Sequence, residues 1–268
     1  MLPKNGTLSL GDASMDYIRF GSGKDTMILL PGLGDGLKTV KGTALPMALM
    51  YSKFGKAFTV YGFSRRDPSP EGVSTRDMAR DVKTAMEILG IQKAHVFGVS
   101  MGGMIAQPLA IDYPEAVEKL VLAVTCSRPN PTLEESIKEW ETAARAGDHA
   151  ALMDSNLRRI YSPKYYRQNK GMIPLLGLIT KPKSYDRFFV LSQACMTHNA
   201  FGQLSSISCP TLVVGGEQDI ALSCDASREL AAKIPGARLH IYPQWGHGLY
   251  EEEPGFNSLI LDFFTGGA

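Results

Sequence analysis

The sequence lacks the features that define several large classes of protein. Its four cysteines (Cys126, Cys195, Cys209 and Cys224) have no Cys-x-x-Cys spacing, which favours reduced thiols over a disulfide framework or a zinc site. No Lys/Arg-rich run occurs and the net charge is only +1, so a nucleic-acid partner is not expected. No apolar run approaches membrane-spanning length, and the N-terminus lacks the apolar core of a secretory signal. We therefore expect a cytoplasmic protein that acts on a small molecule, without a metal, a cofactor or a membrane partner.

What the chain does contain is an alternation of strand-like and helix-like segments. Its 268 residues, 44% of them hydrophobic and 21% charged, suit one large domain or two modest ones. Segments 7–10 and 15–20 predict an antiparallel hairpin. Continuously apolar runs then predict buried parallel strands at residues 26–30, 57–61, 94–99, 120–124, 211–215 and 238–242. Helical periodicity separates them, for example at 75–89 and 226–234. The sequence thus predicts an α/β fold, with a mostly parallel eight-stranded sheet and helices on both faces.

The alternation stops between about residues 127 and 208, where the pattern is helical and is interrupted by prolines. A helical insertion in an α/β domain usually covers the carboxyl ends of the strands, where ligands bind. We therefore expect a core domain of residues 1–126 and 209–268 and a helical cap of residues 127–208. The alternative is a helical layer that only thickens the core. The cap has 11 Lys/Arg against seven Asp/Glu, an excess that either steers anionic substrates or belongs to a solvated outer surface.

The motif Gly98-Val99-Ser100-Met101-Gly102 lies where an apolar run gives way to a helix-like stretch. A serine on a sharp strand-to-helix turn, flanked by glycines, is typical of a nucleophile elbow. The glycines permit the close chain approach that such a turn requires. The N-terminus of the following helix directs free N–H groups towards whatever the serine attacks. We therefore expect Ser100 to be a catalytic nucleophile.

A serine hydroxyl needs a base within hydrogen-bond reach, and the base needs a carboxylate that orients it. Of the five histidines, His247 follows the last predicted strand in a glycine-flanked loop, which makes it the best candidate for the base. The others are less suitable, because His95 and His240 lie within predicted strands and His149 and His198 within the cap.

Asp219 is the candidate carboxylate, because it follows the strand at 211–215 and lies between Ser100 and His247 in chain order. Ser, Asp and His in this order are typical of the nucleophile-elbow arrangement. Glu217 is the nearby alternative for this carboxylate. Asp225 fits better in the first turn of the next helix, where its negative charge interacts favourably with the helix dipole.

Acyl transfer also needs donors for the developing oxyanion, usually two backbone N–H groups. We expect one from Met101, which follows the candidate nucleophile, and one from Leu33, in the glycine-rich loop after the strand at 26–30. That loop lacks the Gly-Lys-Ser/Thr ending and the Gly-x-Gly-x-x-Gly spacing of nucleotide-binding loops. An oxyanion hole is therefore the favoured interpretation of the loop.

Candidate substrate-pocket residues come from the cap and from the end of the strand at 120–124. The cap is rich in Met, Leu and aromatic residues, which favours an apolar underside and a medium-sized acyl or aromatic substrate. We expect Tyr166, Phe189 and Met196 to line this pocket. Cys126 is a further candidate, with a buried, inert thiol as the alternative.

These motifs resemble those of the α/β-hydrolase superfamily, in particular its capped, single-domain branch of esterases and C–C bond hydrolases. The resemblance runs from residues 29–32 through the elbow and residues 209–219 to Gly246-His247. The superfamily usually has His-Gly where this chain has Pro31-Gly32, and Asp-x-Arg-Gly-x-Gly-x-Ser where it has residues 61–66. Ser100 distinguishes the chain from the dehalogenases and epoxide hydrolases of the superfamily, which attack with an aspartate.

The resemblance implies a serine hydrolase that cleaves a carboxylic ester or related acyl bond of a small to medium-sized substrate through an acyl-enzyme. A C–C bond hydrolase, a thioesterase or an acyltransferase would use the same three residues. A non-catalytic ligand receptor is the alternative from a different class of protein, because a fold does not by itself imply an activity.

Overall fold

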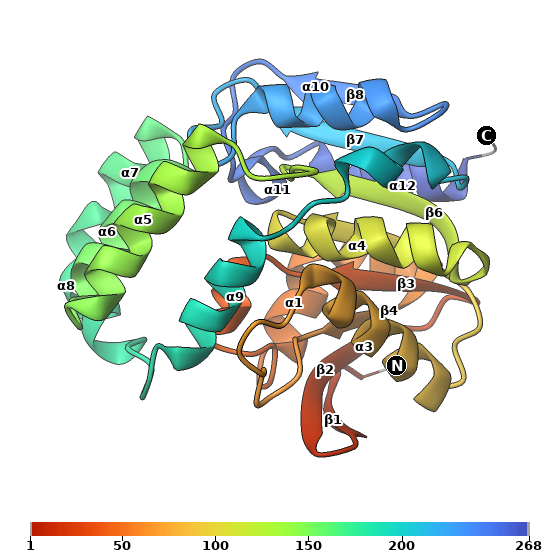
Figure 1. Cartoon of the computed structure of the whole chain (residues 1–268), viewed down its shortest axis with the longest axis horizontal. Coiled ribbons are helices and arrows are strands. Elements are labelled where there is room, and N and C mark those ends of the chain that lie inside the picture. The colour runs from red at the N-terminus through yellow and green to blue at the C-terminus, as the bar shows by residue number, and fades with distance from the viewer. Residues whose placement is uncertain (1, 267–268) are drawn as a thin grey trace.

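Eight strands form one sheet in the computed structural model, which describes residues 2–266 (Figure 1). Their order is β1-β2-β4-β3-β5-β6-β7-β8. The strands are β1 Lys4–Leu10, β2 Ala13–Gly21, β3 Asp25–Leu30, β4 Phe58–Phe63, β5 Ala94–Val99, β6 Val117–Ala123, β7 Thr211–Gly216 and β8 Arg238–Tyr242. β2 is antiparallel to β1 and to β4, and every other neighbouring pair is parallel. The predicted hairpin and the mostly parallel sheet are confirmed.

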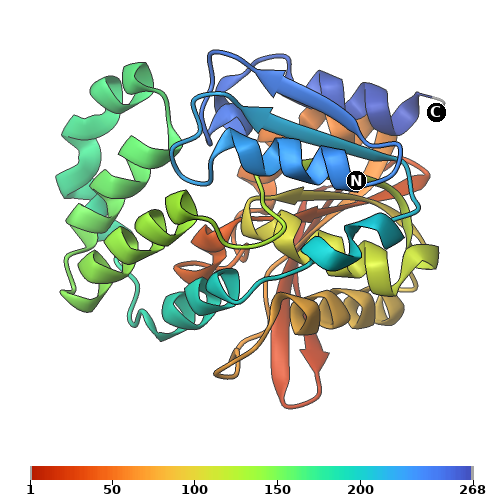
Figure 2. The same cartoon turned by 45° about the horizontal axis from the view of Figure 1, so that its top comes forward.

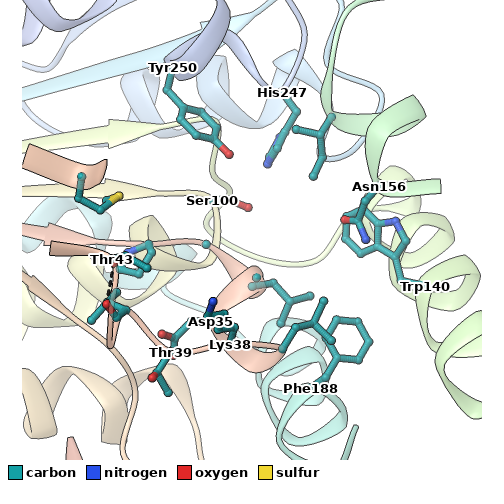
Figure 3. A pocket seen from close by; sticks show the side chains of 18 residues that line it. Asp35, Lys38, Thr39, Thr43, Ser100, Trp140, Asn156, Phe188, His247 and Tyr250 are labelled. Atoms are coloured by element: carbon teal, nitrogen blue, oxygen red, sulfur yellow. Dashed lines mark hydrogen bonds between the residues drawn. The ribbon is translucent and has the colours of Figure 1, made fainter. Parts of the chain in front are cut away.

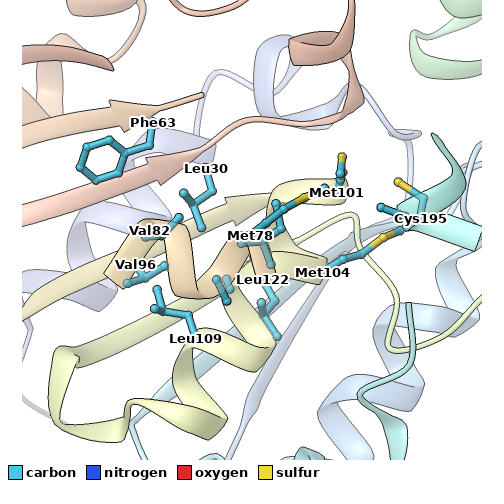
Figure 4. Packing of buried hydrophobic residues seen from close by; sticks show 14 of the residues in the cluster. Leu30, Phe63, Met78, Val82, Val96, Met101, Met104, Leu109, Leu122 and Cys195 are labelled. Carbon is cyan, nitrogen blue, oxygen red and sulfur yellow. The ribbon is translucent and has the colours of Figure 1, made fainter. Parts of the chain in front are cut away.

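The sheet has a hydrophobic core on each face. In β3, Ile28 and Leu30 belong to one buried cluster and Met27 and Leu29 to the other, because successive side chains of a strand point to opposite faces. The first face is covered by α3 Thr75–Ile88, α4 Met101–Asp112 and α10 Cys224–Lys233, and the second by α1 Ala44–Met50, α2 Ser52–Ala57, α11 Leu249–Glu252 and α12 Phe256–Thr265. Figure 4 shows side chains of α3 and α4 packed against those of β3, β5 and β6. Burial on both faces explains why the central strands are continuously apolar.

Some boundaries differ from the predicted ones for reasons of pairing. β6 begins at Val117, because this residue already pairs with Ala94 of β5, and it stops before Val124, whose φ of 43° is incompatible with a strand. β4 continues to Phe63 because that residue pairs with Tyr17 of β2. The sequence did not predict α1, α2 and α11, which have only seven, six and four residues and so show little helical periodicity.

The segment from residue 127 to 208 contains helices and turns but no strand. Its elements are α5 Pro131–Arg145, α6 His149–Ile160, α7 Pro163–Asn169, η3 Lys170–Met172, α8 Ile173–Ile179, α9 Asp186–Met196 and η4 Phe201–Ser206. Both views place α5 to α8 beside the sheet (Figures 1 and 2). α9 packs on η1 (Leu33–Gly36), the 3-10 turn that follows β3, so closely that a Cβ on Gly36 would lie 2.9 Å from Phe188 Cα.

Candidate active site

Ser100 occupies a strained turn between β5 and α4. Its φ of 54° and ψ of −122° lie in a region that non-glycine residues rarely adopt. Neighbouring glycines let the chain pack tightly enough to hold this turn: a Cβ on Gly102 would lie 1.9 Å from Leu30 O, and one on Gly98 would lie 2.6 Å from Gly102 O. The local geometry is therefore that of a nucleophile elbow, with Ser100 at the N-cap of α4.

A buried Asp–His pair stands at the carboxyl ends of β7 and β8. His247 Nδ1 lies 2.8 Å from Asp219 Oδ2, and the two side chains are only 4% and 2% exposed. The other oxygen, Oδ1, accepts hydrogen bonds from the N–H groups of Ala221 and Leu222, at 2.8 and 2.9 Å. These bonds satisfy the carboxylate and fix the orientation of the imidazole ring, leaving Nε2 free for chemistry.

The rival acids bind elsewhere. Glu217 and Asp225 both pair with Arg228, at 2.5 and 3.2 Å, and the side chain of Asp225 is 88% exposed. Of the three acids considered, it is Asp219 that contacts His247.

Ser100 and His247 line the same cavity, whose volume is about 300 Å³. Figure 3 shows the Ser100 hydroxyl, the His247 ring and the Tyr250 hydroxyl facing one space. Within residues 2–266, no hydrogen bond joins Ser100 Oγ to the His247 ring. Such contacts are often loose before a substrate binds and tighten in its presence.

Tyr250, which also lines the cavity, was not predicted from the sequence. It lies three residues after His247, in the first turn of the short helix α11. Because His247 itself precedes that helix, no helical periodicity indicates from the sequence that the two side chains share a face. Burial raises the pKa of Tyr250 well above its usual value, so the phenol stays protonated and can donate a hydrogen bond into the cavity.

The loop after β3 lies against the elbow. A Cβ on Gly32 would lie 3.4 Å from Ser100 Cβ, so the backbone at this point passes next to the serine. Among residues 2–266, neither the Leu33 nor the Met101 N–H donates a hydrogen bond to another group. Both are the first N–H groups of helical turns, the positions that are left without an intrahelical partner.

A buried charge cluster holds the same loop in place. Asp35 Oδ2 accepts hydrogen bonds from the Arg65 N–H at 2.9 Å and from Arg187 Nη2 at 2.5 Å. The Arg65 guanidinium donates to Pro31 O, and Arg187 Nε donates to Asp35 O at 3.1 Å. Arg65 belongs to the segment that departs from the superfamily pattern, and Arg187 belongs to α9. The cluster, named the Asp35 cluster below, therefore links two distant parts of the chain, the segment with Arg65 and helix α9, to the loop that carries Leu33.

The cavity is lined by residues of the core and of the helical segment. Trp140 of α5, Asn156 and Ile160 of α6 and Phe188 of α9 close one side, and residues 31–40 with α1 form the other. The helical segment thus forms part of the wall around Ser100.

None of the predicted pocket residues lines this cavity. Phe188 faces it, and Phe189, one position further around α9, instead packs 4.6 Å from the Arg145 guanidinium. Tyr166 donates from its hydroxyl to Asp154 at 2.8 Å. Met196 and Cys126 pack in the first hydrophobic core. For the three residues on helices, the rotation of each helix about its axis decided the outcome, whereas Cys126 lies in the loop after β6.

The cysteine chemistry follows from burial. Cys126 is 1% exposed, and burial raises the pKa of its thiol well above the usual range, so it is a poor nucleophile. Within residues 2–266, no three or more His, Cys, Asp or Glu side chains are arranged to hold a metal ion. In the same part of the chain, no helix is long and apolar enough to cross a bilayer.

Comparisons with known proteins agree with the fold. A sequence profile described as "alpha/beta hydrolase fold" matches residues 26–154, and one described as "TAP-like protein" matches residues 195–268. The chain is 32% identical over 201 residues to a 2-hydroxy-6-oxo-6-phenylhexa-2,4-dienoate hydrolase of Burkholderia cepacia, covering 70% of this chain and 68% of that one. It is 29% identical over 257 residues to a 2-hydroxy-6-oxononadienedioate/2-hydroxy-6-oxononatrienedioate hydrolase of Klebsiella pneumoniae, covering 91% and 88%.

Among solved structures, MGS-M2, an α/β hydrolase enzyme from a deep-sea metagenome library, superposes with a TM-score of 0.84 at 22% identity, over 98% of both chains. The fold and the sequence relatives define a hydrolase of the α/β class. The chain belongs to the α/β-hydrolase superfamily.

Proposed function

We propose that the protein is a serine hydrolase that cleaves a carboxylic ester of a small to medium-sized substrate. Ser100 attacks the carbonyl carbon while His247 takes its proton, and Asp219 stabilises the resulting imidazolium. The N–H groups of Leu33 and Met101 bind the oxyanion. His247 then returns the proton to the leaving alcohol, and water hydrolyses the acyl-enzyme by the same steps. The observation that carries the proposal is the buried Asp219–His247 pair at a cavity shared with the strained Ser100.

The lining of the cavity supports a largely apolar substrate. Its volume of about 300 Å³ is at the lower end of the range for small-molecule pockets. Trp140, Ile160 and Phe188 contribute large apolar surfaces, and Asn156 and Tyr250 contribute polar groups that can fix the orientation of a carbonyl compound. In this proposal the helical segment acts as a cap that selects the substrate.

Hydrolysis of a C–C bond next to a ketone is the second candidate. The two sequence relatives described above are named as hydrolases of 2-hydroxy-6-oxo dienoates, and the same serine, histidine and oxyanion donors would serve this reaction. Esters and such dienoates differ in the leaving group, which is an alkoxide in one case and a carbanion equivalent in the other.

The test compares the wild type with Ser100→Ala and with Ser205→Ala, which changes an exposed serine in η4. We expect a fluorophosphonate to label the wild type and Ser205→Ala but not Ser100→Ala, with similar melting temperatures for all three. A panel of p-nitrophenyl esters and 2-hydroxy-6-oxo dienoates then separates the two candidates through their kcat/KM values.

Stoichiometric labelling of Ser100→Ala would contradict the assignment of the nucleophile. A wild type that takes up no label and turns over no member of the panel would contradict hydrolysis altogether and favour a ligand receptor.

A further inference from the structure

The helix α8 presents an apolar stripe to the outside of the molecule. Its sequence, Ile-Pro-Leu-Leu-Gly-Leu-Ile, contains no polar side chain. Gly177 packs on α6, where its Cβ would lie 2.9 Å from Ala150, but Leu175, Leu178 and Ile179 are 57%, 77% and 65% exposed. Met172, in η3 just before α8, is 51% exposed. A helix that is hydrophobic on every face is normally buried, so the exposed side of α8 is expected to bind another apolar surface.

Basic residues flank the stripe on both sides. Five exposed cations stand in α7, η3 and the loop after α8: Lys164, Arg167, Lys170, Lys181 and Lys183. No Asp or Glu occurs between residues 155 and 185. Within residues 2–266 none of the five forms a salt bridge, and of these five only Lys181 has a hydrogen-bond partner, Gly147 O at 2.8 Å. The net charge of +1 for the whole chain conceals this local excess.

The acids on the underlying helix α6 are already engaged. Asp148 accepts a hydrogen bond from the Ala151 N–H, which caps α6. Asp154 accepts one from the Tyr166 hydroxyl and pairs with Arg158 at 3.3 Å. These acids therefore compensate the five cations only in part.

The position of α7 and α8 leaves this surface open. In both views they lie at the outer edge of the helical segment, on the side away from the sheet (Figures 1 and 2). Within the described part of the chain, residues 2–266, Leu175, Leu178 and Ile179 stay more than half exposed.

We propose that the basic–apolar surface formed by the stripe and the five cations docks on an anionic lipid bilayer. An apolar helix face flanked by Lys and Arg lies in the interface between headgroups and acyl chains, where it needs no shaped groove. A second copy of the chain is the less favourable occupant, because the five cations of one copy would face and repel the five cations of the other. Docking is peripheral and is independent of the hydrolase chemistry proposed above. It modifies the expectation, drawn from composition, that the protein has no membrane partner.

The experiment measures co-sedimentation with vesicles of phosphatidylcholine, with and without phosphatidylglycerol. Wild type and Ser100→Ala are both used, so that the result does not depend on hydrolysis. We expect both to bind only the phosphatidylglycerol vesicles and to be released by salt. Lys170→Gln and Lys181→Gln should each weaken binding about fivefold. The pair Leu175→Ser and Leu178→Ser should weaken it roughly tenfold or more.

Matched controls change the same residue types at other exposed positions. Lys4→Gln and Lys24→Gln remove charge, and Leu45→Ser with Leu49→Ser on α1 removes exposed apolar surface. We expect these variants to bind as the wild type does, with unchanged melting temperatures throughout.

Two results of the co-sedimentation assay would overturn the proposal. The first is that the wild type does not bind phosphatidylglycerol vesicles, and the second is that the α8 variants and the control variants lose binding equally. A concentration-dependent dimer that the Leu175→Ser, Leu178→Ser variant abolishes would assign the surface to a second copy instead.

Discussion

Removing Arg187 should destabilise the protein and slow its chemistry at the same time. Arg187 pairs with Asp35, whose side chain is 1% exposed, while that of Arg187 is 15% exposed. Arg187→Gln therefore leaves a buried carboxylate without its main counter-charge, a change that typically costs about 3–5 kcal/mol. Because the Arg65 N–H still donates to Asp35 and the buried Arg65 guanidinium still interacts electrostatically with it, we expect the lower value, about 3 kcal/mol. That corresponds to a fall in melting temperature of roughly 6–12 °C.

The kinetic effect follows from the position of Asp35 in the same 3-10 turn as Leu33. A loosened turn displaces the Leu33 N–H, and losing an oxyanion donor entirely costs about 10²–10³ in kcat. For a displaced donor we expect a loss of roughly tenfold in kcat with little change in KM, because this interaction forms in the transition state. Arg187→Lys should recover part of both losses, since it restores the charge.

The control is Arg228→Gln, which breaks the pair with Glu217. Both side chains of that pair are 43% exposed, so its loss should change the melting temperature very little and should leave kcat unchanged. Thermal denaturation and steady-state kinetics measure the two effects. If Arg187→Gln melts like Arg228→Gln, the Asp35 cluster does not stabilise the fold. If it is destabilised but keeps its kcat, the cluster supports only the fold.

Two further predictions concern the elbow and a buried histidine. Gly102→Ala should prevent folding or displace β3, because its Cβ would lie 1.9 Å from Leu30 O; a soluble, active variant with an unchanged melting temperature would refute this. Burial lowers the pKa of His198 to about 4, below the value of about 6.5 in an unfolded chain. The unfolded state therefore binds more protons, and this group alone should reduce the free energy of unfolding by roughly 3 kcal/mol as pH falls from 6.5 to 4. In urea titrations, His198→Asn should reduce the pH dependence of the free energy of unfolding only in part, because burial lowers the pKa of His95 and His149 as well. A variant with the same pH dependence as the wild type would contradict the role of His198.

The sequence by itself was enough to predict the fold class and the loops, at the carboxyl ends of the strands, that carry the candidate catalytic residues. Apolar runs and helical periodicity are local consequences of burial, so the parallel strands and α3 could be predicted within a few residues. Parallel strands end on one edge of a sheet, and therefore the loops after the strands at 211–215 and 238–242 could be expected to meet. The contact of 2.8 Å between His247 and Asp219 agrees with that expectation.

Only the tertiary structure decided which side chains face the cavity and which face outward. Phe188 lines the cavity and Phe189 does not, because the rotation of α9 follows from its packing against the distant turn η1, which a local sequence pattern does not reveal. Arg187 meets Asp35 across 152 positions of the chain, a pairing that no local pattern encodes. For the same reason, the sequence could not predict that Leu178 on α8 is exposed. Apolar residues in a helical pattern predict burial, and only the docked helix shows which of them the rest of the chain leaves uncovered.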